Sequence, residues 1–187
     1  LYDSASIHTA DERQIVVSKR PDVHPAPPVA VVIEYSHSLP SNESDAMMTF
    51  PTFIIAGVKK AATTSMYEYM KQHPQVFMPH IKETKFFLYD PTNPDHVEAG
   101  LNIFPIRSLD EYTALFADAN GARAIGEASH GYIDSLQTAR RVADLLPRVK
   151  LIFSLRNPVE RAYSNYLMRV RSGYEKRPVL EAFRQER

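Results

Sequence analysis

A short apolar stretch, a basic turn and a hydroxyl-rich segment follow one another in PTFIIAGVKKAATTS, residues 51–65. Thr52 to Ala56 is short, apolar and rich in residues that favour β-structure, which predicts a buried strand ended by Gly57. Met66, Tyr67 and Met70 then recur at helical spacing. The first N–H groups of a helix have no intrahelical partner, and its dipole is positive there. This sequence therefore predicts a phosphate-binding turn for a phosphorylated nucleotide.

The residues expected to surround the phosphate are Lys59, Lys60, Ala61, Ala62, Thr63, Thr64 and Ser65. An ATP-type P-loop, GxxxxGK[ST], is one alternative, but Ala62 stands at its second glycine and Thr63 at its lysine. The lysines come earlier, on the turn. A strand, turn and helix with basic solvent-facing residues is the other alternative.

A second segment of the same kind begins at Val149. VKLIFSL, residues 149–155, predicts a buried strand, and a helix is expected from about Val159 to Ser172. Arg156 follows the strand at its carboxyl end, where open α/β sheets bind ligands. Arg156 and Ser164 could together hold a second phosphate. Alternatively, Arg156 pairs with Glu160 and Ser164 packs within the helix.

These segments resemble the sulfotransferase family, whose members use 3′-phosphoadenosine 5′-phosphosulfate (PAPS). FIIAGVKKAATTSMYEYMKQHPQV is similar to the family's 5′-phosphosulfate loop, and KLIFSLRNPVERAYSNY to its 3′-phosphate motif. KETKFF (residues 82–87) and GEASHGY (residues 126–132) also match in order, so the resemblance runs from about Phe50 to Tyr166. The pattern is closer to the bacterial and carbohydrate-type branch. Ala61 and Ala62 replace glycines common in the loop, which is tolerated if their backbone angles are ordinary.

The resemblance implies in-line transfer of a sulfuryl group from PAPS to a hydroxyl or amine, leaving 3′,5′-ADP. It places the general base at Glu83, whereas a surface carboxylate paired with a neighbouring lysine is the alternative. Lys60 is expected to stabilise the departing phosphate, with Lys59 as second choice. The resemblance implies no metal.

Lys85, Ser129 and His130 are candidate substrate-binding residues, and His130 is an alternative base. Lys85 stands where the family often has a histidine before the two phenylalanines. Ser129 and His130 do not predict a hydrolase, because Glu127 occupies a glycine position of the GxSxG nucleophile elbow.

Composition excludes several function classes. The 187 residues contain 22 Lys plus Arg and 22 Asp plus Glu, so no net field favours nucleic acid or an anionic membrane. There is no cysteine, and no His/Asp/Glu set has metal-ligand spacing. No apolar run approaches the roughly 18 residues of a membrane span. We expect a cytoplasmic protein that acts on a small-molecule, carbohydrate or carrier-bound acceptor.

Alternating strands and helices predict an α/β, three-layer fold with a central parallel sheet and a P-loop-like phosphate-binding loop. Residues 1–48 are polar and proline-rich, which predicts a linker or irregular arm with one candidate strand at Val29–Tyr35. Residues 49–187 are expected to form a sulfotransferase domain lacking its C-terminal part, within a larger multidomain polypeptide. An ATP-dependent kinase and a non-catalytic nucleotide-binding module are the alternative functions.

Overall fold

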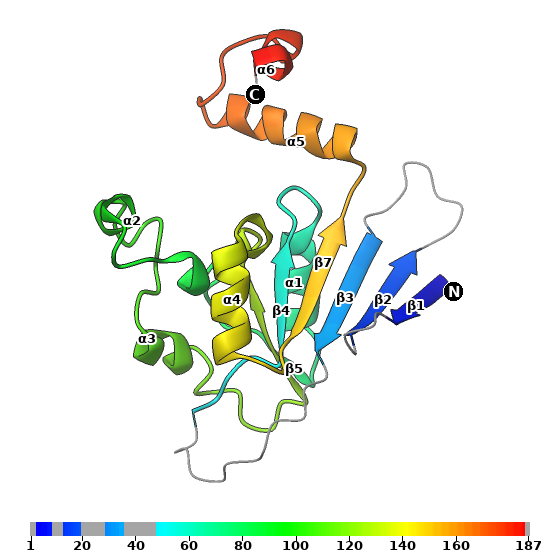
Figure 1. Cartoon of the computed structure of the whole chain (residues 1–187), viewed down its shortest axis with the longest axis vertical. Coiled ribbons are helices and arrows are strands. Elements are labelled where there is room, and N and C mark those ends of the chain that lie inside the picture. The colour runs from blue at the N-terminus through cyan, green and yellow to red at the C-terminus, as the bar shows by residue number, and fades with distance from the viewer. Residues whose placement is uncertain (1–2, 9–12, 20–28, 36–47, 186–187) are drawn as a thin grey trace.

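A computed structural model describes residues 3–8, 13–19, 29–35 and 48–185. These residues form one seven-stranded sheet in the order β1-β2-β3-β7-β4-β6-β5 (Figure 1). The β7-β4-β6-β5 half is parallel, and β3, β2 and β1 extend it by antiparallel pairing beyond β7. The strands are β1 Asp3–His8, β2 Arg13–Lys19, β3 Val29–Tyr35, β4 Phe53–Gly57, β5 Val76–Phe77, β6 Ala124–Ala128 and β7 Lys150–Leu155.

Helices cover both faces of the parallel half of the sheet, so β4 is buried on both sides. Ile54 and Ala56 pack in the cluster that holds α3 and α4, whereas Phe53 and Ile55 pack against α1. Successive side chains of a strand point to opposite faces, so this alternation defines three layers. Figure 1 shows α4 in front of the sheet and α1 behind it. The predicted three-layer α/β fold is confirmed. The helices are α1 Thr63–Lys71, α2 Pro94–Glu98, α3 Leu109–Ala114, α4 Leu136–Leu145, α5 Pro158–Arg171 and α6 Val179–Gln185.

The N-terminal residues contain more regular structure than the sequence predicts. The candidate strand is β3, which pairs with β7 from Val29–Leu155 to Ile33–Leu151. β1 and β2 correct the expectation of an irregular arm, since they continue the sheet by pairing with each other and with β3. Both pairs join strands that are consecutive in the chain. The proline-rich stretches HPAPP and SLPSNESD lie outside the described residues.

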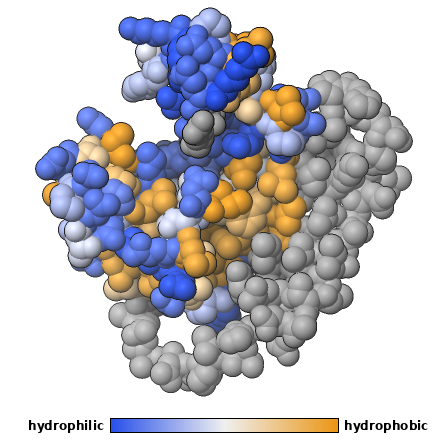
Figure 2. All heavy atoms as spheres, turned by 45° about the horizontal axis from the view of Figure 1, so that its top comes forward, coloured by the Kyte–Doolittle hydropathy of each residue, from blue (hydrophilic) through white to orange (hydrophobic). Residues whose placement is uncertain are grey.

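Helix α5 begins directly after β7 and is well capped at its start. The side chain of Asn157 accepts hydrogen bonds from the backbone N–H groups of Val159 and Glu160, and Pro158 occupies the first turn. The helix predicted there is therefore confirmed to within a residue. α5 and α6 project beyond the sheet (Figure 1), and hydrophilic side chains predominate over them in Figure 2. In the described part of the chain, no helix has the length and apolar character needed to cross a bilayer.

Candidate active site

The two predicted phosphate-binding segments meet at one cavity. β4 and β7 are adjacent and parallel, so the turns that follow them lie at the same edge of the sheet. The cavity there has a volume of about 400 Å³. Basic and hydroxyl side chains predominate in its lining, which consists of Lys59, Lys60, Ala62, Thr63, Thr64, Lys82, His130, Arg156, Ser164 and Met168.

The turn between β4 and α1 leaves the start of the helix open to a ligand. Ala62 is the N-cap residue and supplies no side-chain hydrogen bond to the first amides of α1. Ala61 is buried, and its carbonyl accepts a hydrogen bond from the buried Ser154 hydroxyl of β7. The turn is therefore fixed to the sheet from below, while uncapped amides remain at its helical end. These are the features of an anion-binding site.

The backbone of this turn is less ordinary than the sequence suggests. Lys60 has φ 69° and Ala62 has φ 65°, both in the left-handed region. The condition under which alanine is tolerated, ordinary backbone angles, is therefore not met at Ala62, where an L-residue costs roughly 1–2 kcal/mol relative to the right-handed form. This explains why glycine suits the position.

Arg156 both lines the cavity and pairs with Glu160 of helix α5, which begins two residues after it. Its Nε lies 3.1 Å from Oε2 of Glu160, and both side chains are about one-third exposed. The predicted alternative of an Arg156–Glu160 pair is thus present without removing Arg156 from the cavity. Ser164, one turn further along α5, is half-buried and also lines the cavity.

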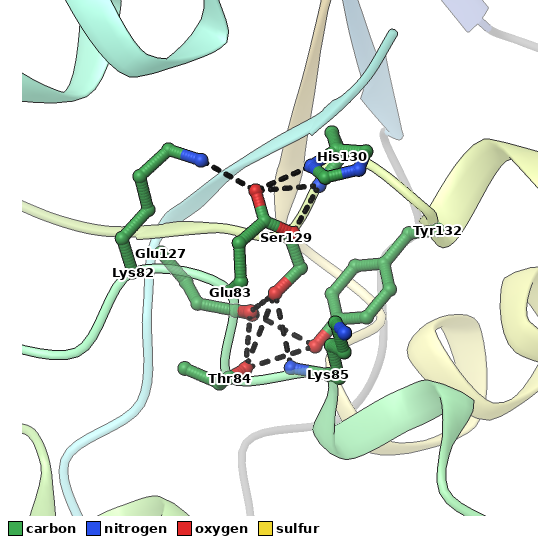
Figure 3. Close-up of polar contacts among 8 residues, drawn as sticks. All are labelled: Lys82, Glu83, Thr84, Lys85, Glu127, Ser129, His130 and Tyr132. Atoms are coloured by element: carbon green, nitrogen blue, oxygen red, sulfur yellow. Dashed lines mark hydrogen bonds and ion pairs between the residues drawn. The ribbon is translucent and has the colours of Figure 1, made fainter. Parts of the chain in front are cut away.

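Glu83 lies between two potential cations (Figure 3). Its Oε1 is 2.5 Å from Nζ of Lys82 and 2.5 Å from Nδ1 of His130, and the His130 backbone N–H donates to Oε2 at 3.2 Å. Burial raises the pKa of the Glu83 carboxyl, but hydrogen bonds and charge from His130 and Lys82 outweigh it and lower the pKa below its usual value. Glu83 is therefore ionised at neutral pH. Because a carboxylate can only accept, Nδ1 of His130 carries the proton and Nε2 is left available.

Similarity to known proteins decides the family. No protein-family model matches the chain. The crystal structure of a sulfotransferase from Alicyclobacillus acidocaldarius superposes with a TM-score of 0.64 at 38% identity, covering 74% of this chain and 57% of that one. The chain belongs to the sulfotransferase family.

Two longer relatives carry the same family name. The membrane-associated sulfotransferase kil1 of Dictyostelium discoideum is 32% identical over 120 residues, which are 64% of this chain and 23% of kil1. The human bifunctional heparan sulfate N-deacetylase/N-sulfotransferase 2 is 33% identical over 120 residues, which are 62% of this chain and 12% of that protein. This chain thus spans less than a quarter of either relative.

Five candidate residues of this sulfotransferase chain do not line the cavity. Glu83 is joined to it through its partners Lys82 and His130, which do line it, and Ala61 is buried in the turn. Ser65 is exposed on α1 and does not line it. Ser129 is fully buried beneath it, where its hydroxyl donates to Glu127. Lys85 caps the 3₁₀ turn Phe86–Leu88 with φ 54°, and its side chain is half-buried outside the lining.

The structure also adds residues that sequence reasoning did not place at the site. Lys82 lines the cavity and contacts Glu83. Its sequence signals were its adjacency to Glu83 and its place in the family-like segment KETKFF. Glu127 carries a buried hydrogen-bond network below the loop that contains Glu83. Its sequence signals were its place in the family-like segment GEASHGY and its mismatch to the hydrolase motif. Among the described residues, no group of three or more His, Asp or Glu side chains is arranged to hold a metal ion.

Proposed function

We propose that this sulfotransferase domain transfers a sulfuryl group from PAPS to a hydroxyl or amine acceptor and releases 3′,5′-ADP. One observation carries the proposal: Lys60 and the open start of α1 share a single cavity with Arg156, Ser164 and His130, the hydrogen-bond partner of Glu83. A nucleotide with phosphates at two positions needs two separate anion sites, and this cavity offers both.

The lining suggests how the donor would be divided between these sites. The 5′-phosphosulfate belongs beside Lys60 and the first amides of α1, and the 3′-phosphate beside Arg156 and Ser164. Lys60 is half-buried whereas Lys59 is exposed, which supports Lys60 as the closer cation. A partly desolvated ammonium interacts more strongly with a phosphate than a solvated one does.

The proposed reaction moves one sulfuryl group and one proton. A lone pair of the acceptor oxygen or nitrogen attacks sulfur, and the bond between sulfur and the bridging phosphate oxygen breaks. The electron pair stays on the 5′-phosphate, where Lys60 stabilises the developing charge. The acceptor's proton passes to Glu83, which we propose as the base.

His130 is the alternative base, because Glu83 can orient its ring and leave Nε2 to take the proton. This is the arrangement in which a carboxylate fixes the tautomer of a catalytic histidine. The contact between Glu83 and His130 means that a variant of either residue disturbs the other. A pH–rate profile is therefore a better discriminator than activity alone.

Ligand-dependent thermal stability tests the proposal directly. A ligand that binds only the folded state stabilises it by about 2.7 kcal/mol at a hundredfold excess over Kd. We expect stabilisation by 3′,5′-ADP and little by ATP with Mg²⁺. The reverse preference would favour the kinase, which already lacks an acidic Mg²⁺ partner after β7, since Arg156 and Asn157 stand there.

Transfer itself is tested by mass spectrometry of acceptors incubated with PAPS. Carbohydrate acceptors with free hydroxyl or amino groups come first, since one relative is named for N-sulfotransfer associated with heparan sulfate. Binding of 3′,5′-ADP without transfer to any acceptor would favour the non-catalytic nucleotide-binding module.

A further inference from the structure

A fully buried carboxylate lies beneath the cavity, at the end of β6. Glu127 has no exposed surface and accepts hydrogen bonds from four hydroxyl groups. Three donate to Oε1, namely Thr84 at 2.6 Å, Ser129 at 2.7 Å and Tyr132 at 2.8 Å, and Tyr112 donates to Oε2 at 2.9 Å. Figure 3 shows the three Oε1 donors converging on this side chain.

Such a group is costly to bury, so its partners must be well placed. Burial raises the pKa of Glu127, and the four hydroxyl donors oppose that rise by stabilising the ionised form. A buried charge without partners is strongly unfavourable, whereas a fully hydrogen-bonded one makes its surroundings rigid. The donors come from the Glu83 loop, from α3 and from the segment after β6, so Glu127 ties these three parts together.

The Glu83 loop is held by this end of β6 at three consecutive positions. Each of residues 83–85 makes a hydrogen bond to one of residues 127–129. The backbone N–H of Glu83 donates to the carbonyl of Ala128 at 2.8 Å, the Thr84 hydroxyl donates to Glu127, and the Lys85 N–H donates to the Ser129 hydroxyl at 3.2 Å.

The loop needs this support because its backbone is strained. Glu83 has φ 62° and Lys85 has φ 54°, so two L-residues in the left-handed region flank Thr84. Such conformations persist only where the surroundings impose them, and they gather at functional sites. Here the conformation presents the Glu83 carboxylate to His130 and Lys82, while the Thr84 side chain turns inward to Glu127.

We propose that Glu127 is a positioning residue that, through the Thr84 hydroxyl, holds the loop in the conformation that presents Glu83 to Lys82 and His130, two residues of the cavity lining. It touches no substrate itself. Its effect on catalysis rests on the proposed sulfuryl transfer, whereas its effect on the loop does not. A displacement of about 1 Å in a reacting group can cost roughly 10²-fold in rate, so loosening the loop should be costly.

Thr84→Val carries the test, because Glu127→Gln alters a fully buried group and can unfold the domain. Valine keeps the shape of threonine and removes only the hydroxyl, Thr84→Ser keeps the hydroxyl, and Thr138→Val is a matched control. Thr138 is a buried threonine of α4 at 2% exposure, and it lies outside this network.

Amide hydrogen exchange measures the loop without any activity. In Thr84→Val, the Glu83 and Lys85 amides should exchange about tenfold faster, as expected for loss of one buried hydrogen bond. The Ser129 amide, which donates to Ile55 of β4 at 3.1 Å, should be unchanged. Thr84→Ser and Thr138→Val should both behave as wild type.

Steady-state kinetics supply the second measurement. In Thr84→Val, kcat should fall by about 10²-fold while the affinity for 3′,5′-ADP stays within about twofold of wild type. Unchanged exchange in Thr84→Val would overturn the proposal, and so would faster exchange with unchanged kcat. If the wild type transfers no sulfuryl group, the proposed function fails, and the exchange measurement still decides whether Glu127 holds the loop.

Discussion

Replacing Arg156 by alanine should weaken binding of 3′,5′-ADP while hardly affecting 5′-AMP. Arg156 lies at the carboxyl end of β7 and lines the same cavity as Lys60. If it holds the 3′-phosphate alone, a nucleotide without that phosphate does not contact it. The comparison of the two nucleotides therefore isolates the 3′-phosphate contact from any general damage to the fold.

The expected loss of binding free energy depends on the ion pair that Arg156 makes when no ligand is bound. Its guanidinium pairs with Glu160 at 3.1 Å, and both side chains are about one-third exposed. A pair of this kind is worth about 0.3–0.5 kcal/mol. A hydrogen bond to a charged group is worth about 1.5–3 kcal/mol, from which the displaced pair must be subtracted. A net loss of roughly 1–3 kcal/mol corresponds to about 5- to 150-fold in Kd.

Glu160 and the 3′-phosphate compete for the Arg156 guanidinium, so a substitution of Glu160 should strengthen nucleotide binding. Glu160→Gln removes the competing carboxylate, so 3′,5′-ADP should bind up to about twofold more tightly. Arg171→Ala is a matched control, because it removes one arginine from the exposed end of α5, outside the cavity lining. Isothermal titration calorimetry with each nucleotide measures all three variants. Equal losses for 3′,5′-ADP and 5′-AMP in Arg156→Ala would refute the assignment.

Three further variants test the turn and the base. Lys60→Ala should lower kcat by a larger factor than it weakens 3′,5′-ADP binding; near-normal turnover, with the loss appearing in Lys59→Ala, would transfer the role to Lys59. Glu83→Gln should cut turnover by about 10²–10⁴-fold with nearly intact PAPS binding. Since the pKa of Glu83 is lowered from 4.5, activity that depends on its ionised form should fall only below about pH 4.5, and an acidic limb of kcat/KM well above that pH would point to another group. Ala62→Gly should raise the free energy of unfolding by up to about 1 kcal/mol in chemical denaturation, because φ is 65° there, whereas Ala61→Gly should lower it.

The local elements of the site were predictable from short stretches of sequence. The strand before Gly57, the strand before Arg156 and the helix after Pro158 all lie within a residue or two of their predicted positions. Each is encoded by neighbouring residues, through apolar runs, a proline at a helix start and hydroxyls at a helix N-terminus. Because β4 and β7 are adjacent and parallel, the two predicted phosphate-binding segments that follow them lie at the same edge of the sheet.

Contacts between distant segments were not predictable in this way. The pairing of Glu83 with His130 joins residues from two different loops, and no local pattern encodes it. The same holds for the pairing of β3 with β7, which joins the N-terminal strands to the parallel half of the sheet across more than a hundred residues of chain. The boundary of the domain near residue 48 and the roles of the site residues stay predictions.

By itself, the sequence determined the family, the α/β layers and the residue types that could bind phosphate, because these depend on local pattern and order along the chain. Only the tertiary structure decided which of those residues share a cavity, because that depends on which loops fold over the same end of the sheet. It removed Ser129 from the cavity and placed Lys82 in the lining. It also surrounded the buried Glu127 with four hydroxyl donors, two from the residues just after β6 and two, Thr84 and Tyr112, from other parts of the chain, and a buried carboxylate needs such partners to be stable.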